Sequence, residues 1–205
     1  MYILEAYNCN DKSKHSNFIE DNNFADLVTF RDGVLCSNKI PFFYDKEKNE
    51  LYGHFGRNNS QLVDIENSNE VLVIFSGAHS YISPQWYKSK NSVPTWNFQT
   101  LQVRGAASIV DDNKLLEILA KLTKFHESKF DKQWTMGKLD SDRREKMLKM
   151  IVGFKIKITD IKFKEKMSQI RDVVDQKSII KALNNSNNSS AKKVAKIMTE
   201  NIELD

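Results

Sequence analysis

Leu51–Gln61, with the sequence LYGHFGRNNSQ, holds the side chains best suited to bind an anion. Arg57 carries a planar guanidinium that can bind a phosphate, and the glycines beside it let the backbone approach a ligand closely. The imidazole, amide and hydroxyl groups that could complete the site belong to His54, Asn58, Asn59 and Ser60. A solvated turn after an edge strand uses the same residue types, so this stretch alone leaves both interpretations open.

Several other chemistries have no pattern in the sequence. The four histidines, at positions 15, 54, 79 and 126, are far apart, and Cys9 and Cys36 lack the spacing of metal ligands. Ser83 and Ser168 have no nucleophile-elbow context, and there is no G-x-G-x-x-G dinucleotide fingerprint. These observations argue against a zinc site, a serine hydrolase and a Rossmann oxidoreductase.

The Arg57 stretch is expected to be held by a meander of antiparallel strands. β-rich runs at 24–30 and 34–44 flank Asp32-Gly33, which is a hairpin signal because glycine tolerates positive φ. Residues 51–55 would pair back on the second strand and deliver the loop, and 61–65 would form a helical turn.

The remaining elements are predicted from periodicity and helix caps. Val71–Phe75 is typical of a buried strand that ends at the small residues 76–78. Ser83 and Pro84 suit a helix cap and first helical position, so a short helix should carry Trp86 and Tyr87. The other predicted elements are helices at 14–22 with Ser13 as a cap, 112–128, 140–149 and about 173–183, and strands at 94–110 and 151–166.

Aromatic side chains are dense between residues 81 and 96. Tyr81, Trp86, Tyr87 and Trp96 all fall within this stretch. Such a cluster suits either a wall that binds an aromatic ring or a dimer interface.

Length and composition predict one domain. The chain has 205 residues, 40% of them hydrophobic, and residues 1–183 would form the domain. Residues 184–205 would form an Asn/Ser-rich mobile linker and a short amphipathic helix. The net charge of +4 comes entirely from residues 155–205, which is a weak signal for nucleic acid. No apolar run approaches the roughly 20 residues of a membrane span and no signal-peptide pattern is present, so we expect a cytoplasmic protein without a membrane partner.

Several segments together resemble one known family. They are Phe24–Thr29, Asp32-Gly33, Ile40-Pro41-Phe42, GHFGRNNSQ from Gly53, VLVIFSGAHSYISPQWY from Val71, VPTWNF from Val93 and KMSQIR from Lys166. In this order they resemble the PaiB-type FMN-binding transcriptional-regulator family, over about nine tenths of the chain. That family is related to the pyridoxamine-phosphate-oxidase-like, or flavin-reductase-like, split β-barrels.

The resemblance implies a mainly β (α+β) fold, an antiparallel six-stranded split β-barrel with peripheral helices. It also implies a homodimer with FMN at the subunit interface. The phosphate role would fall to Arg57 and Asn58, helped by Ser60 or Gln61, with His54 at the phosphate or a flavin carbonyl. The flavin ring would pass Ser37, Asn38 and Lys39. The other implied contacts are Trp86, Trp96, Asn97, Lys166, Ser168 and Gln169.

Two positions depart from the family's usual residues. Lys39 stands where many members have histidine, and its positive charge could stabilise reduced flavin. Ile170 stands where many have asparagine and cannot form a hydrogen bond, so we expect a weaker contribution from Lys166–Gln169.

Two functions are compatible with this resemblance. One is an FMN-binding regulator, and the other is a flavin-dependent oxidoreductase that would use NAD(P)H or a small-molecule substrate. The sequence contains no helix-turn-helix pattern or zinc finger, so direct DNA contact is not indicated. No side chain stands out as a dedicated catalytic acid or base.

Overall fold

The computed structural model describes residues 1–67 and 70–204, which form two compact units. Unit 1 comprises Met1–His15, Ser76–Leu101 and Lys162–Asp205, and unit 2 comprises Ser16–Phe75 and Gln102–Ile161. Three long strands run from one unit into the other.

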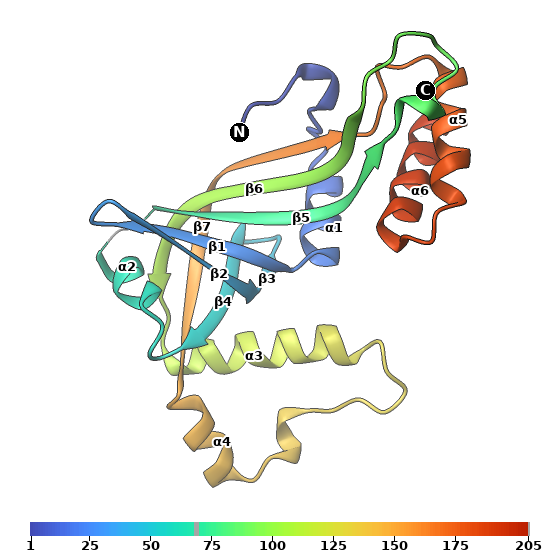
Figure 1. Cartoon of the computed structure of the whole chain (residues 1–205). Helices are drawn as coiled ribbons and strands as arrows, with labels where there is room; N and C mark the ends of the chain where they lie inside the picture. Colours follow the sequence, from blue (N-terminus) through green and yellow to red (C-terminus); the bar gives the residue numbers. More distant parts are fainter. Residues whose placement is uncertain (68–69, 205) are drawn as a thin grey trace. The chain divides into compact units, whose positions relative to one another are not determined.

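The strands form one antiparallel sheet of seven strands (Figure 1). Its hydrogen-bonded order is β2-β1-β5-β6-β7-β4-β3, so β2 and β3 are its edges. The strands are β1 (Phe24–Arg31), β2 (Val34–Pro41), β3 (Phe43–Asp45), β4 (Glu50–Gly56), β5 (Glu70–Ile82), β6 (Thr95–Ile109) and β7 (Ile151–Lys166). The expected antiparallel α+β class is confirmed.

The seventh strand arises because the predicted strand at 34–44 is divided. β2 ends at Pro41, which has no N–H to donate to a ladder, and Phe42 is buried between the two pieces. β3 then pairs with β4, whereas β2 pairs with β1. The β1–β2 turn has positive φ at both Asp32 (53°) and Gly33 (82°), as expected for this Asp-Gly hairpin.

Unit 2 has an aromatic interior. Phe154 stacks on Phe55 with ring centroids 5.0 Å apart, and it forms a T-shaped pair with Phe42 with ring centroids 6.0 Å apart. Helix α3 (Asp112–Glu127) is capped by Asp111, whose side chain accepts from Lys114 N. Its apolar face is buried, as the leucine spacing predicts. The buried residues of α3 are Leu115, Ile118 and Leu122.

Unit 1 has a separate core built on two helices. Helices α5 (Val173–Asn184) and α6 (Ser189–Leu204) lie side by side (Figure 1). They pack with residues of β5 and with Tyr87 and Met167. The fully buried members from the two helices are Ile179, Leu183, Val194, Ala195 and Met198. The C-terminal helix is therefore part of a core.

Some predicted elements differ from those observed. β5 continues through the small residues 76–78 to Ile82, because they belong to the sheet and not to a turn. Ser83 caps a short 3-10 helix at Pro84–Trp86 as predicted, but Tyr87 follows it. Helix α1 (Lys12–Asp21) begins after Asp11, whose carboxylate accepts from Ser13 N at 2.8 Å, so Asp11 takes the role predicted for Ser13.

The remaining helices are short. They are α2 (Gln61–Asn67), α4 (Ser141–Leu148) and two 3-10 helices at Glu5–Tyr7 and Met136–Lys138. Among the helices described, none is long and apolar enough to cross a membrane.

Candidate functional site

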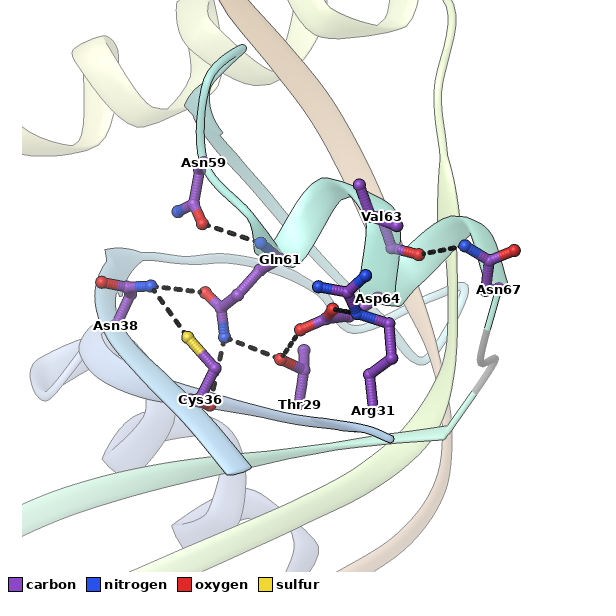
Figure 2. Close-up of polar contacts among 9 residues, drawn as sticks. All are labelled: Thr29, Arg31, Cys36, Asn38, Asn59, Gln61, Val63, Asp64 and Asn67. Carbon is purple, nitrogen blue, oxygen red and sulfur yellow. Dashed lines mark hydrogen bonds and ion pairs between the residues drawn. The ribbon is translucent and has the colours of Figure 1, made fainter. Parts of the chain in front are cut away.

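Gln61, the first residue of α2, is completely buried, and its side chain joins α2 to the β1–β2 hairpin (Figure 2). Its Nε2 donates to the carbonyl oxygens of Leu27 at 2.9 Å and Cys36 at 3.3 Å, and to Thr29 Oγ1 at 3.2 Å. Its Oε1 accepts from Asn38 Nδ2 at 3.0 Å. Because carbonyl oxygens only accept, the contacts determine which end of the Gln61 amide is the nitrogen.

A buried carboxylate extends this network. Thr29 Oγ1 donates to Asp64 Oδ2, and Asp64 Oδ1 lies 2.7 Å from Arg31 Nε. The single hydroxyl proton of Thr29 is used on Asp64, so Thr29 can only accept from Gln61. The network thus begins at the ion pair of Arg31 and Asp64 and continues through Thr29 and Gln61 to Asn38.

Asn38 lies half-buried on β2 and uses its nitrogen within the network. Nδ2 donates to Gln61 Oε1 and also contacts Cys36 Sγ at 3.7 Å. Its Oδ1 points away from both partners in Figure 2, and no donor in the ranges 1–67 and 70–204 reaches it. Asn38 therefore presents an acceptor that is available to a ligand.

The loop that follows β4 lies against the same Gln61. Asn59 Oδ1 accepts from Gln61 N at 2.9 Å, so Gln61 connects the loop to Asn38. Asn58 and Ser60 are exposed, and their side chains have no hydrogen-bond partner in the part of the chain that the structure describes. The structure thus brings four sequence-predicted residues into one region: Asn38, Asn58, Ser60 and Gln61.

Arg57 has a structural role in this loop. Its Nε donates to Lys149 O at 2.9 Å and its Nη2 to Ile151 O at 3.1 Å. Its backbone N–H donates to Met150 O at 2.8 Å. Arg57 is exposed, so part of its guanidinium also faces solvent. A phosphate contact by Arg57 stays a prediction.

Ser37 and Lys39 lie on the opposite face of β2 from Asn38, because side chains alternate along a strand. Lys39 Nζ lies 2.8 Å from Asp26 Oδ2 and 5.9 Å from the ring centroid of Phe24. The lysine charge is therefore already paired on that face.

His54 is also separated from Asn38 by the alternation of side chains. A Cβ on Gly53 would lie 3.2 Å from Ile40 Cγ2, so Gly53 faces the side of Ile40 and Asn38, and His54 faces the other side. His54 Nδ1 is buried without a partner among the described residues. Burial lowers the pKa of His54, so its ring is neutral at neutral pH.

In unit 1, Asn97 and Ser168 serve as internal hydrogen-bond partners. Ser168 Oγ donates to Asn97 Oδ1 at 3.0 Å, and Asn97 Nδ2 contacts Met198 Sδ at 3.4 Å. Asn97 has no exposed surface, and Ser168 is buried with a positive φ of 61°. These contacts hold the turn after β7, so any effect of either side chain on a ligand would be indirect.

The neighbouring predicted residues of unit 1 are also engaged. Gln169 donates to Glu165 O at 2.7 Å and accepts from Met167 N at 2.7 Å, which closes the same turn. Lys166 Nζ donates to Thr95 Oγ1. Burial lowers the pKa of Lys166, with the positive charge of Lys164 adding to the effect.

The two predicted tryptophans differ in exposure. Trp86 is partly buried against the core of unit 1. Trp96 is 53% exposed, and Tyr81 meets it edge-on with ring centroids 6.0 Å apart. The ring centroids of His79 on β5 and Trp96 on β6 lie 6.4 Å apart. Trp96, Tyr81 and His79 thus form an exposed aromatic group on β5 and β6.

A surface cavity of about 510 Å³ in unit 2 contains none of the predicted residues. Its lining residues are Lys48, Glu50, Tyr52, Ile109, Val110, Asp111, Lys114 and Lys155. Lys155 is paired with Glu50 and Lys114 with Glu117. Within the lining, Lys155 and Glu50 thus neutralise each other.

Sequence reasoning missed Thr29, Arg31 and Asp64. One signal was available, because β1 alternates Ala25, Leu27 and Thr29 on its buried face, and a buried hydroxyl needs a partner. Which residue would provide that partner depends on α2 folding over the hairpin.

The donors and acceptors present are suited to FMN. Asn38 offers an acceptor for the N–H of the flavin ring, and the loop amides and hydroxyl offer donors to a phosphate. These groups are solvent-accessible or half-buried, in contrast to Gln61 and Asn97. The chemistry of the Asn38 region therefore fits this group.

Comparisons with known proteins agree with this fit. A family model described as "Putative FMN-binding domain" matches residues 1–160. The "Protease synthase and sporulation protein PAI 2" of Bacillus subtilis (strain 168) is 35% identical over 205 residues, which cover 99% of each chain.

Two solved structures share the fold. One is the FAD and heme binding protein from Mycobacterium smegmatis, with a TM-score of 0.60, 13% identity and coverage of 78% of this chain and 73% of that one. The other is the flavocytochrome Anf3 from Azotobacter vinelandii, with a TM-score of 0.60 and 12% identity. The match covers 78% of this chain and 69% of that one. The family match and the full-length identity to PAI 2 show that this chain belongs to the PaiB-type FMN-binding family, with FMN as its cofactor and the split-barrel class of fold.

Proposed function

We propose that the chain holds FMN with β2 and the loop at residues 56–60, and that it acts as a regulator-type flavoprotein. The observation that carries the site is the contact of Gln61 with both Asn38 and Asn59. Through it, a free acceptor on β2 lies beside a loop with unpaired amide and hydroxyl groups. Asn58, Ser60 and Arg57 would bind the phosphate, and Asn38 would orient the ring.

The described side chains of this region bind and orient; they do not transfer protons. They are amides, hydroxyls and a guanidinium, none of which changes protonation near neutral pH. Bound FMN supplies its own capacity to accept and return electrons, and the protein's part is to hold it. The side chains of this region therefore support a role in binding and orienting FMN.

A second copy of the chain would complete the assembly. The aromatic group of Trp96, Tyr81 and His79 leaves Trp96 53% exposed, and exposed aromatic clusters are typical of interfaces. Relatedness to a family with flavin at a subunit interface supports the same assembly. Size-exclusion chromatography with light scattering should give a dimer at micromolar concentration, and a strict monomer would contradict it.

The function is tested by three measurements on the purified protein. Visible absorbance should show bound flavin or its uptake from added FMN; a protein that takes up none would contradict the binding proposal. NAD(P)H should bleach the bound flavin slowly under anaerobic conditions. Binding to random duplex DNA should be measured from low salt upward, where phosphate-driven affinity is strongest. Fast bleaching without DNA affinity at any salt would replace the regulator with an oxidoreductase.

A further inference from the structure

Gln61 determines the orientation of the neighbouring Asn38 amide. Both hydrogens of Gln61 Nε2 are directed at groups that accept in this network, the carbonyls of Leu27 and Cys36 and the hydroxyl of Thr29. The buried Gln61 therefore has only its Oε1 to offer to Asn38. An acceptor at that place requires a donor opposite, so Asn38 must turn Nδ2 inward and Oδ1 outward.

The reverse orientation of Asn38 is disfavoured. It would place Asn38 Oδ1 against Gln61 Oε1, leaving two acceptors face to face in a largely buried position. It would also remove the donor from Cys36 Sγ, which lies 3.7 Å from Nδ2. The Asn38 amide is thus held in one of its two orientations before any ligand arrives.

The ion pair at the far end strengthens this preference. Arg31 contacts Asp64, Asp64 accepts from Thr29, and Thr29 accepts from Gln61. Consecutive hydrogen bonds that share one donor direction polarise one another. Figure 2 shows the side chains of this network, which continues from Arg31 and Asp64 through Thr29 and Gln61 to Asn38. The outward Oδ1 of Asn38 is the acceptor at its end.

We infer that Gln61 is a positioning residue that selects the ligand through Asn38, by presenting an acceptor to a ligand N–H group. This inference rests on the proposed FMN function. Oxidised flavin has one N–H, at N3 between the two carbonyls of its pyrimidine ring, and that group is the partner we assign to Asn38 Oδ1. The inference also changes the role expected of Gln61, from a phosphate contact to an internal support.

The test compares the affinities of FMN and of FMN methylated at N3, which has lost the donor. The wild-type protein should bind FMN about tenfold more tightly, because the methylated ligand leaves Asn38 Oδ1 without a donor. Asn38→Leu should reduce the ratio to within about twofold. Gln61→Met removes the acceptor that orients the Asn38 amide, so it should also lower the affinity ratio.

Thr29→Val is the matched control. Valine removes one partner of Gln61 and the bond to Asp64, so stability should fall, but the carbonyls of Leu27 and Cys36 still orient the amide. The affinity ratio should therefore fall only slightly in Thr29→Val and be lost in Gln61→Met. If the affinity ratio falls in proportion to the loss of stability in both variants, Gln61 has only a structural role.

A second measurement needs no variant at Gln61. In NMR spectra of the flavin-free wild-type protein, the side-chain amide hydrogens of Asn38 should exchange slowly, and FMN should shift them more than the N3-methyl analogue does. Rapid exchange there would overturn the positioning role. Equal binding of both flavins would overturn the inference while leaving FMN binding intact, whereas absence of binding by either flavin would overturn both.

Discussion

Arg31 Nε lies 2.7 Å from Asp64 Oδ1, and the side chain of Asp64 is only 6% exposed while that of Arg31 is 41% exposed. The guanidinium therefore compensates a carboxylate that α2 has carried into the interior of unit 2. Removing one member of such a pair is costly, because the remaining charge stays desolvated.

Arg31→Met is expected to destabilise the protein by about 1 to 3 kcal/mol, a value reduced from that of a fully buried pair because Arg31 is partly solvated. Urea unfolding at neutral pH measures the change. Lys39→Met is the control, since the Lys39–Asp26 pair is more exposed and should contribute less than about 1 kcal/mol. Equal losses in the two variants would show that the burial of Asp64 is not decisive.

The pH dependence of stability should include a contribution from His54. Burial lowers its pKa in the folded protein, so the unfolded chain binds the proton more tightly. The stability contribution of the neutral ring is present above the unfolded pKa of about 6.5 and is lost as pH falls toward the lower folded value. Urea unfolding at pH 7.5 and pH 5 should show a smaller drop for His54→Gln than for wild type. A drop in His54→Gln as large as that in wild type would contradict this contribution.

Local signals allowed much of the fold to be predicted. The Asp32-Gly33 hairpin, the Ser83 cap and the buried face of α3 each depend on residues within a few positions of one another. The length of β5 was not predictable in this way, because small residues that favour a turn locally are held in a strand by pairing across the sheet.

The candidate site was predicted less well, for a related reason. Gln61 was expected to meet a phosphate, but it is buried because α2 covers hairpin residues 25 to 34 positions away. Asn97 and Ser168 meet across 71 positions. Residue type and spacing identified polar groups near the site, whereas their burial is decided by contacts that no local pattern encodes.

Gly105 should tolerate no side chain. A Cβ at this position would lie 2.3 Å from Lys157 O, a backbone atom of β7 that cannot move aside independently. Gly105→Ala is expected to cost about 2 kcal/mol or more, because the two strands must separate locally. Gly56→Ala provides the control, since nothing lies within 4 Å of its added Cβ. Thermal unfolding of both variants would test this, and an unchanged Gly105→Ala protein would contradict the close approach.

The C-terminal helix should be required for the stability of unit 1. Met198 on α6 is completely buried in the core shared with α5. Met198→Ala is therefore expected to cost about 2 to 5 kcal/mol, as for other large-to-small changes in a core. Lys193→Ala, on the exposed face of the same helix, should change stability by less than about 0.5 kcal/mol. Similar values for the two variants would indicate that α6 is not packed as described.

Arg57 has two separable roles, and two ligands distinguish them. Its donation to the carbonyls of Lys149 and Ile151 orders the loop, and its solvent-facing part is available to a phosphate. If it binds the phosphate, Arg57→Ala should weaken FMN binding by about 1.5 to 3 kcal/mol and leave riboflavin, which has no phosphate, nearly unchanged. Flavin fluorescence titrations with both ligands measure the two affinities. Arg57→Lys retains the charge but not the planar fork, so it should recover part of the FMN affinity. Equal weakening of FMN and riboflavin would mean that Arg57 acts only by holding the loop, and the phosphate would then have to be bound by Asn58 and Ser60.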